Sequence, residues 1–204
     1  ARLDQEGLFD PSRKRELPKF PVKVAVVTSE SGAVWHDIVD VFQRRYPLAE
    51  LVLFPTSVQG DSAVPEIVSS FTKLNIHTDI DVVILARGGG SKEDLSVFNE
   101  EDLARAVFSS NYPVISAIGH ETDTTIVDLV ADVRAPTPSA AAEIAAPNLV
   151  EILDSININF QRFNIEIDRI TKSAKELVSL QNARISDLLP DFVSLRIFED
   201  LPID

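Results

Sequence analysis

Short apolar runs alternate with segments of helical spacing over the first two thirds of the chain. The runs occupy residues 24–27, 51–54, 82–85 and 114–117, and they are typical of strands covered on both faces, as in a parallel sheet. Between them, apolar residues recur at three- and four-residue steps, which predicts helices around residues 34–42, 67–74 and 103–107. This alternation predicts the α/β class: a doubly wound, mainly parallel sheet of about four or more strands flanked by helices.

A helical pattern occupies the rest of the chain. Thr137 offers a capping hydroxyl and Pro138 suits the first position of a short helix. From Leu149 to about Leu189 an apolar stripe predicts one long C-terminal helix laid against a partner, with apolar residues at positions 149, 152, 156, 160, 163, 167, 170, 174, 177, 180 and 185. Pro190 predicts its end. Because the repeat is imperfect, packing on its own domain and an intersubunit coiled coil both stay open.

These patterns divide the chain into three parts. Residues 1–20 are polar and charged, with a basic run at 13–15, and are typical of a connector rather than of a core. We therefore expect a linker at residues 1–21, an α/β domain at 22–147 and a helical extension at 148–204.

The composition excludes some classes of protein. The chain has no cysteine, so disulfides and thiolate metal sites are excluded and a reducing, cytoplasmic location is expected. No apolar run approaches the roughly 20 residues that span a bilayer, so no membrane association is expected. The formal net charge is −13, whereas non-specific affinity for nucleic acid comes mainly from cations that neutralise phosphates. A DNA-holding surface must therefore be a local basic cluster or lie on a part outside this chain.

The candidate catalytic and ligand-binding residues lie where the predicted strands end, which is where ligands bind in open α/β sheets. After the first strand, Thr28, Ser29 and Gly32 belong to a hydroxyl-rich turn whose amides suit a phosphate oxygen. Asp37 lies near the start of the helix that follows. An ordinary turn between strand and helix, with a capping serine, explains the same residues equally well.

The strongest phosphate signal follows the third strand. Arg87 is succeeded by Gly88, Gly89, Gly90 and Ser91. Consecutive glycines let backbone N–H groups bend into an anion-binding nest, and an arginine is able to clamp two phosphate oxygens. The spacing is neither that of a Walker loop nor that of a dinucleotide fingerprint. A flexible turn with a surface arginine is the alternative.

A histidine follows the fourth strand. His120 stands one helical turn before Asp123, a spacing at which a carboxylate orients an imidazole for general acid or base catalysis. Asp37, Glu121 and Asp123 would be the oxygen ligands of a Mg²⁺ ion, although no spacing demands one. Arg134 belongs to a basic turn that would either guide nucleic acid or simply lead the chain into the next helix through two prolines.

These motifs, in this order, resemble the large subunit of exonuclease VII. The resemblance covers about residues 6–150 and rests on collinear stretches at residues 26–37, 44–50, 54–60, 87–95, 98–100, 113–123 and 131–141. The helical tail is similar only in character. Two positions depart from the family pattern: His36, where Arg is common, and Ser96, where Trp is common. These departures would weaken substrate contact without removing the chemistry.

The resemblance implies an activity and the residues that perform it. The activity is hydrolysis of phosphodiester bonds in single-stranded DNA, from both ends and into short oligonucleotides. Asp37, Arg87, His120 and Asp123 match the family's expected catalytic group. No cofactor is expected to be required, with Mg²⁺ as an open alternative.

The resemblance also implies further parts and partners. An N-terminal OB-fold that grips single strands would precede this stretch, small subunits would bind the helical region, and large subunits would self-associate as a further option. This stretch alone is therefore expected to be inactive or weakly active. Two other interpretations stay open: a non-catalytic scaffold or DNA-binding module, and a different α/β enzyme that acts on a phosphorylated small molecule.

Overall fold

The structure, a computed structural model, describes residues 2–76, 79–89, 93–119 and 123–188. The chain divides into two compact units, Ala1–Val150 and Glu151–Asp204. The strands in the described ranges are β1 (Lys23–Thr28), β2 (Glu50–Pro55), β3 (Val82–Ala86), β4 (Val114–Ala117) and β5 (Val133–Arg134). The helices are α1 (Arg2–Gln5), η1 (Pro11–Arg13), α2 (Ala33–Arg45), α3 (Ala63–Leu74), η2 (Glu93–Asn99), α4 (Glu101–Phe108), α5 (Ile126–Val130), α6 (Pro138–Ala145) and α7 (Leu149–Leu188).

The strands form one parallel sheet in the order β2-β1-β3-β4-β5. The predicted α/β class is therefore confirmed. One strand was not visible as an apolar run: β5 pairs Val133 with Ile115 and Arg134 with Ser116. Arg134, which the sequence placed in a turn, is thus the last residue of an edge strand.

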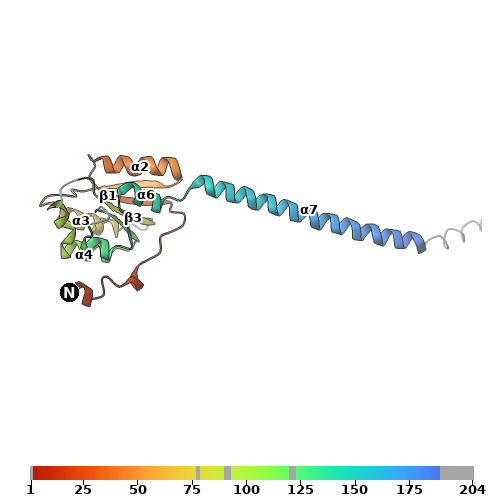
Figure 1. The fold of residues 1–204 in the computed structure, drawn as a ribbon, viewed down its shortest axis with the longest axis horizontal. Helices are drawn as coiled ribbons and strands as arrows, with labels where there is room; N and C mark the ends of the chain where they lie inside the picture. The colour runs from red at the N-terminus through yellow and green to blue at the C-terminus, as the bar shows by residue number, and fades with distance from the viewer. Residues whose placement is uncertain (1, 77–78, 90–92, 120–122, 189–204) are drawn as a thin grey trace, which may run out of the picture. The chain divides into compact units, whose positions relative to one another are not determined.

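Helices cover both faces of the sheet, because the strand side chains alternate between two apolar clusters. Val24 and Val26 pack with α2 and α6 on one face, while Ala25 and Val27 pack with α3 and α4 on the other. Figure 1 shows α2 and α6 on one side of the sheet and α3 and α4 on the opposite side. The predicted cap of α6 is confirmed, since the Thr137 hydroxyl accepts a hydrogen bond from the Ala140 N–H at 3.1 Å.

The segment before β1 is docked on the first unit. Leu3 and Leu8 are buried in the same cluster as α3 and α4, which corrects the expectation that these residues stay outside the core. Arg15 adds a two-pronged ion pair to Asp132, with Nη2 at 2.8 Å from Oδ2 and Nε at 3.1 Å from Oδ1. The Arg13 guanidinium lies 5.2 Å from the centre of the Phe108 ring, a cation–π distance. Whether this segment links to a further domain stays a prediction.

The second unit is built on α7, which confirms the predicted long helix. None of the described residues of α7 is buried, and Phe160 and Phe163 are 63% and 60% exposed. The apolar residues of the stripe from Ile156 onward are therefore exposed. The predicted stop at Pro190 lies outside the described residues. Within the described ranges, no helix combines the length and the apolar character that crossing a bilayer would need.

The Asp132 carboxylate ties the N-terminal segment to the sheet. Its Oδ1 accepts from the Arg15 N–H and its Oδ2 from the Val114 N–H, both at 2.7 Å. Burial alone would raise the pKa of Asp132, but the hydrogen bonds from Arg15 and Val114 outweigh it and hold this pKa below its usual value. The carboxylate therefore stabilises the fold above its unfolded-state pKa, and this contribution is lost as pH falls through the folded-state pKa.

Asp132→Asn is accordingly expected to lower the free energy of unfolding by about 2 kcal/mol near neutral pH. Thermal unfolding, followed from neutral pH down to about pH 3, should show the gap in Tm between wild type and variant narrowing in acid. Asp40→Asn removes an exposed carboxylate on α2 and serves as the control with little effect. A gap that stays constant with pH would contradict the assignment.

Candidate active site

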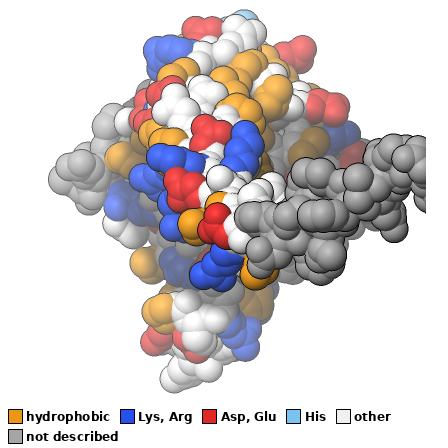
Figure 2. Space-filling view, turned by 90° about the vertical axis from the view of Figure 1, so that its right-hand side faces the viewer, with side chains coloured by type: hydrophobic (Ala, Val, Ile, Leu, Met, Phe, Trp, Pro, Cys, Tyr) orange, Lys and Arg blue, Asp and Glu red, His pale blue; other side chains and the backbone are white. Residues whose placement is uncertain are grey.

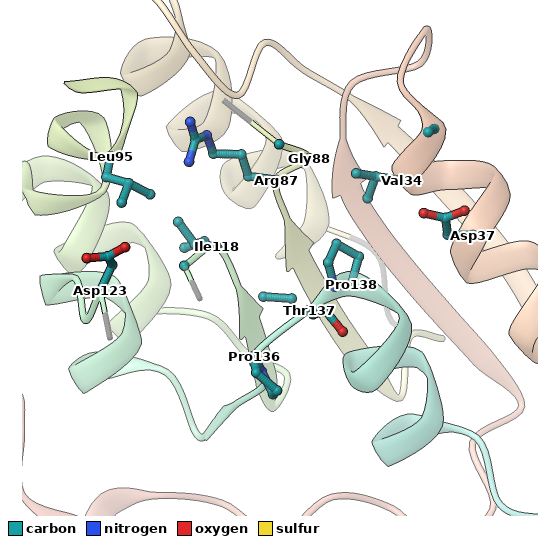
Figure 3. A pocket seen from close by; sticks show the side chains of 14 residues that line it. Val34, Asp37, Arg87, Gly88, Leu95, Ile118, Asp123, Pro136, Thr137 and Pro138 are labelled. Carbon is teal, nitrogen blue, oxygen red and sulfur yellow. The ribbon is translucent and has the colours of Figure 1, made fainter. Parts of the chain in front are cut away.

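A cavity of about 360 Å³ opens where β1, β3 and β4 end. The strand order changes direction between β1 and β3, and ligands of open α/β sheets bind beyond the carboxyl ends of the strands at such a point. Figure 3 shows the cavity from close by. Its walls are formed by Ala33, Val34, Asp37, Arg87, Gly88, Gly89, Leu95, Ala117, Ile118, Gly119, Asp123, Pro136, Thr137 and Pro138.

Arg87 is the basic residue of this lining. It follows β3 directly, and its N–H donates to the Ala117 carbonyl at 3.1 Å, so the β3–β4 ladder continues to the base of the side chain. Arg87 is only 5% exposed, yet it lines the cavity. A charge in such a low-dielectric position attracts an opposite charge more strongly than it would in water. A guanidinium held there suits a phosphate oxygen.

The glycines after Arg87 bring the backbone close to α2. A Cβ added to Gly88 would lie 3.1 Å from Cγ2 of Val34, so the turn after β3 packs directly on the first turn of α2. Gly88 and Gly89 both line the cavity. Their location is compatible with the predicted role of backbone amides in holding an anion.

Two carboxylates face the cavity from different elements. Asp37 is an exposed residue on the second turn of α2, and Asp123 is a partly buried residue just before α5. In Figure 3, Asp123 lies on the side of Leu95 and Asp37 lies across the cavity, beyond Val34. The structure therefore gathers Asp37, Arg87 and Asp123 around one cavity.

Other residues singled out in the sequence do not line this cavity in the described ranges. Thr28 is fully buried, and among the described atoms its hydroxyl has no hydrogen-bond partner. A Cβ added to Gly32 would lie 2.6 Å from the Ser29 hydroxyl, so this turn closes on itself, as an ordinary turn between strand and helix does. His120, Glu121, Gly90 and Ser91 lie outside the described residues.

Arg134 is directed at the segment that carries Asp123. Its Nε lies 3.8 Å from Oδ2 of Asp128, and its Nη2 donates to the backbone carbonyl of Asp123 at 3.5 Å. Arg134 was predicted to contact substrate. The structure shows a different contact: the Arg134 guanidinium joins the loop before α5 to that helix.

Asp128 is the polar residue that sequence reasoning missed. It is 2% exposed and completes a capping box at the start of α5, in which the Thr125 hydroxyl and the Asp128 carboxylate cap each other's backbone N–H. The signal in the sequence is a Thr followed three residues later by an acid, ahead of an apolar run. That signal predicts a cap, but it does not predict burial of the carboxylate.

The arrangement provides one guanidinium and two carboxylates at one cavity. Carboxylates also suit a hard divalent cation. Within the parts of the chain that the structure describes, no three acidic or histidine side chains gather closely enough to hold a metal ion. Glu121, the third predicted oxygen ligand, is not among those residues, so the metal prediction stays untested.

Comparison with known proteins identifies relatives along nearly the whole chain. Residues 8–193 match the family model described as "Exonuclease VII, large subunit". An exodeoxyribonuclease 7 large subunit of Latilactobacillus sakei subsp. sakei is 52% identical over 186 residues, which is 91% of this chain and 41% of that protein. The protein of the same name from Geobacillus kaustophilus is 55% identical over 155 residues, which is 76% of this chain and 35% of that protein. The chain thus spans about two fifths or less of the length of these relatives.

Gly119 offers a test of the loop geometry. A Cβ at Gly119 would overlap the backbone carbonyl oxygen of Asp123, so Gly119→Ala is expected to cost about 1–3 kcal/mol as the loop shifts. Gly89→Ala is the matched control, because no atom lies within 4 Å of its added Cβ. Denaturant unfolding of the two variants provides the measurement. Equal stabilities would show that the 119–123 loop does not close as described.

Proposed function

This chain belongs to the exonuclease VII large-subunit family, and from that membership we propose that it contributes the active site of a nuclease. The reaction is hydrolysis of phosphodiester bonds in single-stranded DNA, from both ends and into short oligonucleotides. It takes place in a complex of large and small subunits. Such a nuclease works in the cytoplasm, where bacterial DNA lies.

The observation that carries this proposal is the position of Arg87. Arg87 is only 5% exposed and lines the cavity, and two carboxylates from other elements, Asp37 and Asp123, line the same cavity. A guanidinium that lines a cavity at the switch point of an α/β sheet suits an anionic ligand. A backbone phosphate of DNA is an anion of the right charge and size for a cavity of about 360 Å³.

The proposed chemistry is attack of water on that phosphate. Arg87 and the amides of Gly88 and Gly89 hold the phosphate and offset the charge that grows on its oxygens. The water oxygen bonds to phosphorus, the bond to the leaving oxygen breaks, and that oxygen takes a proton. His120, oriented by Asp123, either accepts the proton of the water or donates one to the leaving oxygen. Asp37 positions the water, a metal ion or Arg87.

The mechanism is proposed to need no metal ion. If Mg²⁺ binds, Asp37, Glu121 and Asp123 would hold it, since carboxylate oxygens are the donors it prefers. It would then supply a positive charge that polarises the phosphate.

The proposed partners follow from membership of the family and from the apolar stripe of α7. We propose that the uncovered apolar stripe of α7 binds small subunits, with self-association of large subunits as the second option. Burial of such a stripe is the driving force of coiled-coil assembly. Single-stranded DNA would be gripped mainly by other parts of the large subunit, so the stretch alone is expected to be inactive or weakly active.

The first experiment measures cleavage of end-labelled single-stranded DNA by the full-length large subunit assembled with its small subunit. Removing the general acid or base in His120→Ala is expected to slow cleavage by about 10²- to 10⁴-fold. Removing the phosphate clamp in Arg87→Ala should slow it by about 10²- to 10³-fold. Arg44→Ala, which removes an exposed arginine on the last turn of α2, is the control and should retain activity.

The outcomes separate the proposal from its rivals. Undiminished cleavage by His120→Ala, with assembly intact, would leave this unit a scaffold or DNA-binding module. A rise in Tm with small phosphorylated ligands but not with single-stranded DNA would favour a different α/β enzyme, because a ligand that binds only the folded state stabilises it. Parallel reactions in EDTA decide the metal requirement.

A second experiment addresses the helical extension. Phe160 lies on the apolar stripe and is 63% exposed, whereas the adjacent Gln161 lies off the stripe. Phe160→Glu in the full-length large subunit is expected to reduce co-purification of the small subunit by at least about ten-fold, since a charge would enter an apolar interface. Gln161→Glu adds the same charge and should assemble normally. Equal assembly of both variants would place the small subunits elsewhere.

A further inference from the structure

A buried carboxylate joins the segments that carry the candidate active site. The Asp128 side chain on α5 has no exposed surface. Its Oδ1 accepts from the Ser116 hydroxyl at 2.6 Å. Its Oδ2 accepts from the Thr125 N–H at 2.8 Å and from the Thr125 hydroxyl at 2.9 Å. Arg134 completes the group, with its Nε 3.8 Å from Oδ2.

These partners belong to three different segments. Ser116 is in β4, Thr125 precedes α5, and Arg134 ends β5. Burying a carboxylate away from water is costly unless hydrogen-bond donors satisfy its oxygens. A shift of β4 or of the turn at Thr125 would cost the carboxylate a hydrogen bond, and a shift of β5 would lengthen the ion pair with Arg134. The carboxylate therefore acts as a shared anchor for this end of the sheet.

The anchor lies at one end of the loop between β4 and α5. That loop, residues 118–125, carries Asp123, which lines the cavity. Arg134, held by Asp128, also donates to the Asp123 carbonyl at 3.5 Å. Asp128 therefore contacts the loop directly at Thr125 and, through Arg134, at Asp123.

We propose that Asp128 is a positioning residue of the nuclease site, acting through Thr125 and Arg134 to fix the place of Asp123. The proposal rests on the proposed function. Asp128 does not line the cavity, so it acts without touching substrate. Arg87 is fixed instead by the β3–β4 ladder, through its N–H bond to Ala117. Loss of the anchor therefore disturbs the loop that carries Asp123 and leaves the phosphate clamp in place.

Because Asp123 and Arg87 have separate supports, the proposal predicts different effects on kcat and on KM. Asp128→Ala removes the carboxylate, and Thr125→Val removes the hydroxyl while retaining shape and the backbone N–H. In the assembled full-length complex, both are expected to lower kcat on single-stranded DNA by about ten-fold or more, as misplaced catalytic groups do. The KM should change by less than about three-fold, because the Arg87 clamp remains. Thr125→Ser keeps the hydroxyl and should restore kcat to within about two-fold of wild type.

A matched control separates positioning from simple loss of stability. Val130 is a buried apolar residue at the other end of α5, so Val130→Ala weakens the same helix without touching the carboxylate. It should lower Tm and leave kcat unchanged at a temperature where the complex stays folded. A fall in kcat with Val130→Ala equal to that with Thr125→Val would overturn the proposal. So would unchanged kcat in both Thr125→Val and Asp128→Ala.

Hydrogen exchange gives a readout that does not depend on nuclease activity. Amides between residues 119 and 128 are expected to exchange faster in Thr125→Val than in wild type, while those of β1 and β3 keep their protection. Unchanged exchange in the 119–128 segment would overturn the anchor. If the wild-type complex fails to cleave single-stranded DNA, the proposed function fails, and faster exchange in this segment would still support the anchor.

Discussion

The carboxylate of Asp128 has no contact with water and therefore needs donors around its oxygens. It accepts hydrogen bonds from β4 and from the turn before α5, and it forms an ion pair with Arg134 of β5 at 3.8 Å. A second carboxylate four residues later, Asp132, does the same for the other end of β4, where it accepts from Val114 and Arg15. The connection between β4 and β5 is therefore held to the sheet by Asp128 in α5 and by Asp132 just before β5. Since this crossover carries Asp123, the geometry of one cavity wall depends on these two buried acids.

The opposite walls depend on the order of the strands. Because β1 and β3 are neighbours but lead to helices on different faces, the segments that follow them diverge and leave room between them. Val34 and Gly88 meet on the β1 and β3 side at close contact. Arg87 enters the space from a strand end that is tied into the ladder. The cation is therefore positioned by the sheet and one carboxylate by a loop, which gives the two groups independent supports.

Much of this architecture is predictable from the sequence, because a buried parallel strand is a run of apolar residues. The runs at residues 82–85 and 114–117 became β3 and β4 almost residue for residue. A strand of two residues, such as β5, is too short to show any period. Leu3 and Leu8 are single apolar residues among charged ones, so their burial depends on tertiary contacts. The burial of Asp128 could not be predicted for a similar reason. An acid near a helix start is usually solvated, and nothing local in the sequence indicates its partner on β4.

The acidic balance of the chain bears on how such a site would work. The formal net charge of −13 opposes the long-range attraction that brings nucleic acid to basic proteins. On the face of the described residues shown in Figure 2, acidic, basic and hydrophobic side chains are interspersed. Arg87 lines the cavity, and its burial strengthens its field at short range. A charge that acts only at short range contributes little to capture of a long strand and much to a phosphate already in place. If the proposed function holds, this unit would therefore act on DNA that other surfaces deliver.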